Sequence, residues 1–409
     1  MLGFDWLKKS AVVKLDQLAD MAGFVRYGTS AGLPVSPQTA VQVAAVFCAV
    51  RVIAEDIAKM PVRVMSEDFD DNGMTKQTVA RDHWATRLLS RRPNEFQTSF
   101  EFREYALLSA VLDKGFLGVK NINSRGEIVE ILPVPMGSWS VLRHPNQWGH
   151  YFEVYDSDSN TIGRFEPSAV MYLRGPSLDG WRALPAISAA REAIGLSLAL
   201  EKQHSRLAGQ GGKPSGVLSF ENALNPEQRA KLRETWQDKF GPSGEGGVAI
   251  LDQAAKFESM VMKSVDAQYI ETRQFQVEEV ARAFRVHPNK LMHSGNQSTF
   301  ASAESFNRSH VTDALMPWVK RFEEVADRDI LGNKSGLRVD LDEHSLLRGD
   351  FKDQGEYYTK ALGSGGQPGW MTPNEIRAEV GLNPRPEEWA NQVPQGAMND
   401  KGASDGNEG

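Results

Sequence analysis

This sequence has one cysteine, no long apolar run and no surplus of positive charge. Its 409 residues include one cysteine, Cys48, so no disulfide can form within the chain. No apolar run approaches the ~20 residues that a membrane span needs, and the opening residues MLGFDWLKKSAVV lack the apolar core and cleavage site of a signal peptide. The formal net charge of −7 disfavours a basic surface that grips nucleic-acid phosphates. We therefore expect a globular protein with no membrane contact and no tight hold on DNA.

The residue patterns of common catalytic sites are also missing. The run GQGGKPSG resembles a phosphate-binding loop, but Leu207 stands where its first glycine is needed and Pro214 where serine or threonine should follow the lysine. The eight histidines are scattered, and the acids in 340–344 follow strand-like alternation, which favours a solvated edge over a metal site. Cys48 lies in an apolar run without an evident base, so we interpret it as a buried structural thiol. We expect no catalytic residues, no metal site and no cofactor.

What the sequence contains is a series of well-delimited helices and short strands, typical of an α+β fold. A helix is predicted over 39–60, where Pro61 stops it, and a strand follows over 62–65. Several short alternating runs between residues 116 and 174 predict a β-rich region. The first helix is expected to bury the face formed by Val43, Phe47, Val50, Ala54 and Ile57.

Two other helices open with the capping-box pattern Thr-x-x-Glu, in which each side chain satisfies a free backbone N–H group of the other residue. One of them begins at Thr98 and continues to residue 112. The other begins at Thr372, has proline in its first position and is stopped by Gly381. Purely local signals therefore predict both helices.

Two longer helices are predicted in the middle of the chain. The first runs uninterrupted from Arg182 for roughly 24 residues, or about 36 Å, and its alanines allow another helix to approach closely. The second starts with Asp266 as its N-cap and ends near Val286, because Pro288 lacks a backbone donor and restricts the residue before it. Its apolar face is predicted to comprise Ile270, Val277, Val280, Ala281 and Phe284, with Gln274 as a polar break.

A polar segment, 287–302, separates the second long helix from another helix that is predicted to kink at Pro317 and to end at Gly332. Lys290 is the only formal charge between residues 287 and 303. Against the net charge of −7, this local positive charge favours weak, exchangeable phosphate contact, although a solvated loop explains the composition equally well. The candidate contact residues are Asn289, Lys290, His293, Asn296 and Gln297.

Six segments, in this order, resemble the portal proteins of tailed bacteriophages, in the Hong Kong 97-type family. The resemblance covers roughly residues 40–385. It is carried by AVFCAVRVIAEDIAKMPVRV, LLSRRPNEFQTSFEFRE, LPAISAAREAIGLSLALEKQHSR followed by KPSGVL, ETRQFQVEEVARAFRVHPNKL, LMPWVKRFEE and MTPNEIRAEVGL.

The resemblance implies a portal fold with a β-rich wing, two long stem helices, a small α/β clip, a tunnel loop, a long kinked helix and a short helical crown. An N-terminal arm precedes these parts, and the tail that follows them has the acidic, polar composition of a disordered segment. The expected parts are the arm 1–38, the wing 39–182 together with 303–343, stem helix 183–213, clip 214–265, stem helix 266–286, tunnel loop 287–302, kinked helix and wing strand 303–343, crown 344–385 and disordered acidic tail 386–409.

The resemblance also implies a function. Twelve copies would form a ring at one capsid vertex of a virion assembled in the host cytoplasm, and double-stranded DNA would pass through the ring during packaging and ejection. The implied partners are other copies of the chain, the large terminase subunit, the major capsid protein and a head-tail adaptor. The alternatives are a nucleic-acid-processing enzyme and a structural scaffold without a channel, which solution mass and particle images would distinguish.

Overall fold

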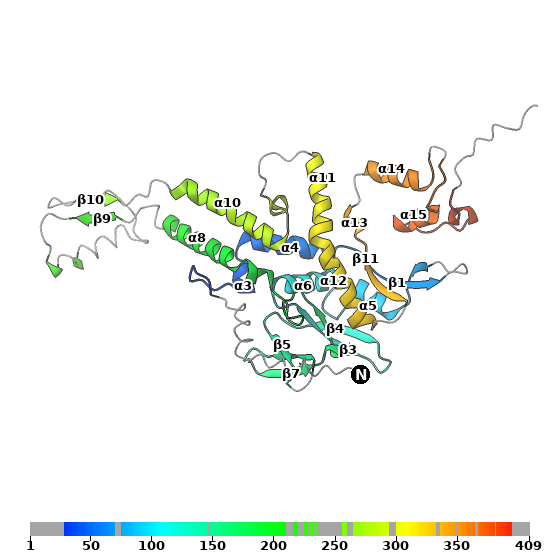
Figure 1. The fold of residues 1–409 in the computed structure, drawn as a ribbon, viewed down its shortest axis with the longest axis horizontal. Helices are drawn as coiled ribbons and strands as arrows, with labels where there is room; N and C mark the ends of the chain where they lie inside the picture. Colours follow the sequence, from blue (N-terminus) through cyan, green and yellow to red (C-terminus); the bar gives the residue numbers. More distant parts are fainter. Residues whose placement is uncertain are drawn as a thin grey trace, which may run out of the picture. The chain divides into compact units, whose positions relative to one another are not determined.

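The computed structural model (Figure 1) describes residues 28–69, 75–145, 148–209, 216–219, 225–227, 230–231, 234, 256–259, 265–293, 300–332, 336–347, 351–364, 367–380 and 382–394. The chain divides into two compact units, Met1–Asp342 (unit 1) and Glu343–Gly409 (unit 2). In the described part of the chain, no helix has both the length and the apolar character needed to cross a bilayer.

Unit 1 begins, in its described part, with a segment that lies on a helix of the same unit. The Ser30 backbone N–H donates to Glu192 Oε2 at 3.1 Å. A Cβ atom added to Gly195 would lie 2.6 Å from the side chain of Thr29, so only glycine allows this approach. Residues 29 and 30 of the expected arm thus contact α8 (Arg191–Gly209), and residues 1–27 lie outside the described part.

Helices α4 (Ala44–Ala58) and α6 (Ser99–Leu112) pack against each other in unit 1. The short helices α3 (Pro37–Ala40) and α5 (Trp84–Ser90) precede them, each capped by a side chain. The predicted face of α4 is wrong at Phe47, which is 50% exposed. Phe47 lies one helical turn before Arg51 and two before Glu55, so it shares their solvent-facing side of the helix. The residues that the structure buries are Val46, Ala49, Val50, Ile53, Ala54, Ile57 and Ala58.

Among the described residues of unit 1, three antiparallel three-stranded sheets and one two-stranded pair form the β structure. The first has the order β11-β1-β2 and pairs Val62 with Leu341, which joins residues far apart in the sequence. The other two, β4-β3-β8 and β5-β6-β7, occupy the predicted β-rich region. The strands are β1 (Val62–Phe69), β2 (Thr75–Val79), β3 (Phe116–Ile122), β4 (Ile128–Pro133), β5 (Trp139–Arg143), β6 (His150–Tyr155), β7 (Thr161–Phe165), β8 (Val170–Leu173) and β11 (Leu337–Leu341).

An aromatic core joins the sheets β4-β3-β8 and β5-β6-β7. The Trp139 and Tyr172 rings meet edge to face with centroids 5.7 Å apart, and the Phe152 and Tyr172 centroids are 4.9 Å apart. Such edge-to-face pairs add roughly 0.5–1.5 kcal/mol to the free energy gained from burial. The buried members of this cluster are Leu117, Val134, Trp139, Phe152, Val170 and Tyr172.

The two long rods of unit 1 lie side by side as α8 (Arg191–Gly209) and α10 (Val265–Phe284) (Figure 1). The prediction of one uninterrupted helix from Arg182 is wrong, because Pro185 is extended and a short helix, α7 (Ala186–Ala189), comes first. At Ala190 the backbone angles leave the helical range, although its N–H still donates to the Ala186 carbonyl at 3.1 Å. The interruption is therefore a local irregularity within a nearly continuous rod.

Helix α10 also differs from its prediction. It starts at Val265, one residue before the expected cap. Ile270 is 57% exposed, and the buried part of the helix begins only at Gln276 and continues with Val280, Ala281 and Phe284. The spacing rule correctly placed the last three residues on one face, but it extended that face too far towards the N-terminus.

The helix after the polar segment is built from four consecutive pieces. They are α11 (Phe300–Ser309), a π-helical turn η4 (His310–Leu315), α12 (Met316–Ala326) and a second π-helical turn η5 (Asp327–Leu331). Gly332 closes the helix in the left-handed conformation at φ +70°, which confirms its predicted role as the stop.

In the sequence between α8 and α10, the described residues form a small antiparallel pair, β9 (Gly216–Ser219) with β10 (Lys256–Ser259). The described residues among 226–234 are helical, beginning at Pro226. Residues 235–255 lie outside the described part.

Unit 2 contains the helices α13 (His344–Leu347), α14 (Phe351–Ala361) and α15 (Pro373–Glu379), and a 3-10 turn, η6 (Glu388–Asn391). The prediction of disorder from residue 386 is wrong for 386–394. Ala390 in η6 is fully buried, and the Pro394 carbonyl accepts a hydrogen bond from the Gly369 N–H at 2.9 Å. The prediction followed the acidic, polar composition, which gives no sign of these backbone contacts. Residues 395–409 lie outside the described part.

Candidate functional site between α10 and α11

The site starts where α10 ends. Arg285 adopts a left-handed conformation at φ +57°, and the next N–H, that of Val286, reaches back to the Ala281 carbonyl at 2.9 Å. This geometry closes a helix C-terminus, and it is usually made by glycine. Val286 is then buried, which anchors the chain as it leaves the helix.

A 3-10 turn, η3 (Pro288–Leu291), follows directly. The His287 Nδ1 accepts from the Asn289 N–H at 3.3 Å, so the histidine caps the turn that Pro288 opens. The His287 ring also stacks on Phe306 of α11, with centroids 4.0 Å apart. This stacking ties the start of the segment to the helix that begins after it. The sequence predicted a helix break at Pro288. In the structure Pro288 opens a capped turn, and α10 ends four residues earlier, at Phe284.

The turn is held on α4 through its backbone. Cys48 donates from its thiol to the Lys290 carbonyl, with the sulfur 3.6 Å from the oxygen. Cys48 is only partly buried, so the prediction of a buried thiol is wrong. This contact joins residues 242 positions apart, and nothing local in the sequence indicates it.

Three of the five candidate contact residues lie in the described part. Asn289 and Lys290 are in the turn and are partly exposed, and His293 follows it with its N–H donating to the Pro288 carbonyl at 3.1 Å. The His293 Nε2 lies 3.9 Å from a Glu278 carboxylate oxygen of α10. The turn therefore brings these three residues together, whereas Asn296 and Gln297 lie outside the described residues.

Close to the turn lies a buried polar pair that sequence reasoning missed. His310 of η4 is 4% exposed, and its Nε2 lies 2.9 Å from Asp56 Oδ2 on α4. Asp56 also accepts from Lys59 Nζ at 2.6 Å. Burial acts to raise the pKa of Asp56, but the hydrogen bonds from His310 and Lys59 outweigh it and hold that pKa below its usual value. The pair fixes η4 on α4.

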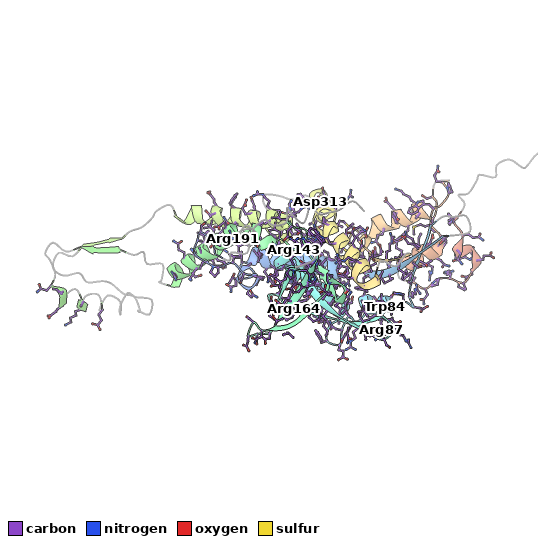
Figure 2. All side chains as sticks on the ribbon, turned by 60° about the horizontal axis from the view of Figure 1, so that its bottom comes forward. Trp84, Arg87, Arg143, Arg164, Arg191 and Asp313 are labelled. Atoms are coloured by element: carbon purple, nitrogen blue, oxygen red, sulfur yellow. The ribbon has the colours of Figure 1, made fainter. Side chains whose placement is uncertain are left out.

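A cleft of about 420 Å³ opens between the end of α10 and the start of η4. Asp313, labelled in Figure 2, is on its η4 side and accepts from the Ser309 hydroxyl at 2.7 Å. Both signs of charge therefore occur in its walls, which does not suit a simple anion site. Its lining residues are Glu278, Ala281, Arg282, Arg285, Val286, His287, Pro288, Ser309, His310 and Asp313.

Pro317 occupies the first turn of α12, immediately after the π-helical turn η4. Proline is tolerated there because the wider turn before it already disturbs the regular hydrogen bonding. The next turn carries Arg321, whose guanidinium lies over the Trp318 ring at 5.0 Å. The irregularity expected at Pro317 thus coincides with a change of helix type, and the kink itself stays a prediction.

The acids of the 340–344 cluster do not form the solvated edge that was predicted. Asp342 is 8% exposed, and its Oδ2 accepts from Arg63 Nη2 at 3.3 Å. No group of three or more potential metal ligands occurs among the described residues. The site's described residues offer capping, stacking and partly exposed polar groups.

Comparison with known proteins identifies the family of the chain. A family model described as phage portal protein matches residues 44–381. The chain is 29% identical to a probable portal protein of Streptomyces phage phiC31, covering 88% of this chain and 78% of that protein. It is 24% identical to the portal protein of Enterobacteria phage HK97, covering 93% and 88% of the two chains.

Solved structures show the same fold. A Corynebacterium diphtheriae structure described as an HK97 family phage portal protein aligns at a TM-score of 0.56 and 16% identity, covering 75% of this chain and 95% of that one. A chain from the neck of a native gene transfer agent particle, computed with C12 symmetry, aligns at 0.57 and 20%, covering 85% and 92%.

The mixed helix and sheet fold is that of the portal proteins. The chain belongs to the phage portal protein family, and its role is that of the head-tail connector of a phage or a gene transfer agent particle.

Proposed function

We propose that twelve copies of this chain form a closed, non-catalytic ring at one capsid vertex, and that double-stranded DNA passes through the opening. The observation that carries the proposal is the match to portal proteins along nearly the whole chain. The twelvefold count is supported by the gene transfer agent neck that was computed with C12 symmetry.

The rods provide surfaces for lateral packing. Helix α10 buries Val280 and Phe284 inside its own unit, yet it exposes Ile270 and Phe275 at 57% and 53%. Large exposed apolar side chains on a helix suit contact with a further neighbour. On α4, Phe47 is half exposed as well. A closed ring requires each copy to present two unlike surfaces, and apolar side chains on different helices satisfy that requirement.

The segment after α10 is proposed to line the opening and to contact DNA. Asn289, Lys290 and His293 are its described members, and Asn296 and Gln297 are assigned the same role from the sequence. Each phosphate contact by a cation strengthens binding and makes it salt-dependent. Because Lys290 is the only formal charge in 287–303, the contacts are few, so DNA can slide past them.

The remaining parts receive their roles from the family resemblance. We assign 39–182 with 303–343 to the wing, 183–213 and 266–286 to the stem, 214–265 to the clip, 287–302 to the tunnel loop and 344–385 to the crown. The clip is proposed to dock the large terminase subunit during packaging and the head-tail adaptor afterwards. The major capsid protein would surround the ring, which is assembled in the host cytoplasm.

Imaging and mass measurement of the purified protein test the ring. Twelve copies of a 45.3 kDa chain give roughly half a megadalton, and particle images should show a central hole. A small oligomer would favour the enzyme alternative, and a large assembly without a hole would favour the scaffold. Either result would contradict the proposal.

Charge removal tests the DNA-facing segment. Lys290→Gln combined with His293→Gln should leave rings intact, lower DNA retention in particles and make retention less salt-dependent. The matched control is Arg125→Gln, which removes one positive charge from the exposed β3–β4 turn. Equal retention in wild type and the double variant, across a salt series, would remove the segment from this role.

A further inference from the structure

Three arginines of unit 1 come together from three different elements. Arg174 directly follows β8, Arg285 directly follows α10, and Arg321 lies in the second turn of α12. Helix α12 packs on β8, and a Cβ atom added to Gly175 would lie 3.2 Å from the Trp318 ring. The Arg321 guanidinium lies over that same ring, 5.0 Å from its centroid. The tryptophan therefore lies between the end of β8 and the Arg321 side chain.

Arg285 approaches the other two arginines from α10. It lines the cleft between the end of α10 and η4, and α12 continues directly from η4. Burial lowers the pKa of Arg321, and the positive charges of Arg174 and Arg285 lower it further. A nearby carboxylate would raise that pKa, but no carboxylate of the described residues does so. The surroundings of Arg321 are therefore positively charged.

The three guanidinium groups have few partners. Each of them has five N–H donors. The Arg174 Nη2 donates to the Gly180 carbonyl at 2.9 Å, and the Arg321 Nη1 donates to the Pro317 carbonyl at 3.5 Å. Within the described part of the chain, Arg285 has no side-chain partner, and none of the three arginines forms an ion pair. Most of their donors are therefore free to bind a ligand.

Acids in the same region are engaged with other groups. Asp313 accepts from two hydroxyls of its own continuous helix. Glu278, in the cleft wall, lies 3.9 Å from His293. Asp179, in the loop after β8, accepts from the Arg182 side chain and from two backbone N–H groups. Positive charges that face one another without a counter-charge repel, so an anion from outside the chain would stabilise this arrangement.

We propose that Arg174, Arg285 and Arg321 form a binding site for a phosphate group with three free oxygens, either inorganic phosphate or the terminal phosphate of a DNA strand. The planar fork of a guanidinium binds phosphate through two parallel hydrogen bonds. A terminal phosphate has about −1.5 to −2 charge at pH 7 and three acceptor oxygens. A backbone phosphate of DNA has a single charge, so it matches three arginines less well.

The exposure of the arginines indicates how a phosphate would enter. Arg174 and Arg321 are partly buried, whereas Arg285 is exposed, so the site is open to solvent on the side of Arg285. All three residues belong to unit 1 of one copy, so binding does not depend on the proposed ring. A bound phosphate joins the end of α10 to α12 and β8, and it stabilises unit 1 as any ligand of the folded state does.

Titration calorimetry of the full-length protein with inorganic phosphate tests the site, at an ionic strength held constant with sodium chloride. We expect saturable binding. Arg285→Gln changes an exposed side chain and should weaken binding roughly tenfold or more, because charge-assisted hydrogen bonds are lost. Arg321→Lys should also weaken it, since lysine keeps the charge but lacks the planar fork. The matched control is Arg87→Gln, which removes a positive charge from an exposed position of α5 and should leave affinity unchanged.

Two DNA probes distinguish the sources of the phosphate group. If a short duplex with 5′-phosphorylated ends displaces inorganic phosphate and the same duplex without end phosphates does not, the site takes a DNA end. If neither duplex displaces it, the site takes the free ion. Equal displacement by both duplexes would overturn the inference, because the backbone would then be the ligand.

Two further results would also overturn the inference. One is the absence of phosphate binding by the wild-type protein. The other is equal affinity of the wild type and Arg285→Gln, because phosphate would then bind elsewhere. Particle images of the same samples show whether rings are present, so failure of the proposed ring and failure of this site are observed separately.

Discussion

The two units of this chain are stabilised in different ways. Unit 1 fully buries large side chains, among them Trp139, Phe102, Phe116, Phe152 and Phe322, whereas in unit 2 the buried side chains are two alanines among the residues whose burial is described. Burying one large apolar side chain is worth about 1.5–3 kcal/mol, more than the roughly 0.5–1.5 kcal/mol net of a hydrogen bond. Unit 1 therefore has its own source of stability, and unit 2 depends on hydrogen bonds and on its surroundings.

The difference fits a connector whose parts meet different demands. A ring wall must keep its shape while DNA moves past it, and an interlocked apolar core does that because packed interiors deform little. A small unit held mainly by hydrogen bonds opens at low cost in free energy. Substitutions that remove either kind of support test this contrast directly.

The largest effect is expected from truncating the core of unit 1. Phe102 of α6 is fully buried, and its ring meets that of Phe116 edge to face at 5.3 Å. Phe102→Ala should lower the free energy of unfolding by about 3–5 kcal/mol, because it removes apolar contacts and leaves a cavity. Urea unfolding followed by far-UV circular dichroism measures this loss. Phe96→Ala, at a 66% exposed position of the same unit, should change it by less than about 0.5 kcal/mol.

A smaller and more local effect is expected from breaking the hydrogen bonds of unit 2. Asn374→Ala removes the three bonds to Arg385 and Asn391 and should cost unit 2 roughly 2 kcal/mol. Hydrogen exchange should accelerate in 370–380 and 382–394, while α6 keeps its wild-type protection. Asn383→Ala is the matched control, since Asn383 contributes its backbone carbonyl to Arg377 and keeps that bond. Faster exchange in α6 as well as in unit 2 would contradict the independence of the two units.

Local signals explain what the sequence predicted correctly. The capping boxes at Thr98 and Thr372 involve residues three apart, and the helix stop at Gly332 depends on one residue's conformation. In the same way, alternation over a few residues was enough to predict the β-rich region. These features are decided within one turn or one strand, so the sequence alone contains the information.

Long-range contacts explain what the sequence could not predict. The thiol of Cys48 meets the Lys290 carbonyl, and His310 meets Asp56, across separations of 242 and 254 residues. On α4, Phe47 shares the exposed face of Arg51 and Glu55, a spacing that the sequence does contain but that the predicted face overlooked. For the candidate site, residue types and the break near Pro288 were predictable, but the contacts that anchor the turn were not.

Unit 1 also contains a loop held by hydrogen bonds, around Asp179. Stability measured over a range of pH tests how much the charge of Asp179 stabilises that loop. Asp179 accepts from the Trp181 and Arg182 N–H groups, both at 2.8 Å, and from the Arg182 side chain. Partial burial acts to raise the pKa of Asp179, but these bonds outweigh it and lower that pKa to about 2. Since the folded-state pKa lies below the unfolded value of 3.8, the stabilisation is complete above about pH 4 and is lost as pH falls towards 2.

Asp179→Asn should therefore lower the free energy of unfolding at pH 6 by on the order of 1 kcal/mol, given screening by solvent. The gap between wild type and variant should shrink as pH falls from about 5 to 2. Urea unfolding at a series of pH values measures the gap. Asp158→Asn, in the exposed β6–β7 turn, is the control and should show no such trend. A gap that stays constant across the series would mean that the Asp179 charge does not stabilise the loop.

The smallest effect compares one substitution in two settings, because both units contain a helix opened by Thr-x-x-Glu. Thr98 caps α6, which buries Phe102 and Leu107, and Thr372 caps α15, in which no side chain is buried. Replacing a capping threonine with alanine costs about 1 kcal/mol. Thr98→Ala should thus lower the global free energy of unfolding, since tertiary contacts keep α6 folded until the unit unfolds. Thr372→Ala should leave the global transition of unit 1 unchanged and speed amide exchange in 373–379 several-fold, because no packed face prevents α15 from fraying. If both variants shifted the same global transition equally, the two units would unfold as one, and the contrast between packed and hydrogen-bonded stability would not describe this protein.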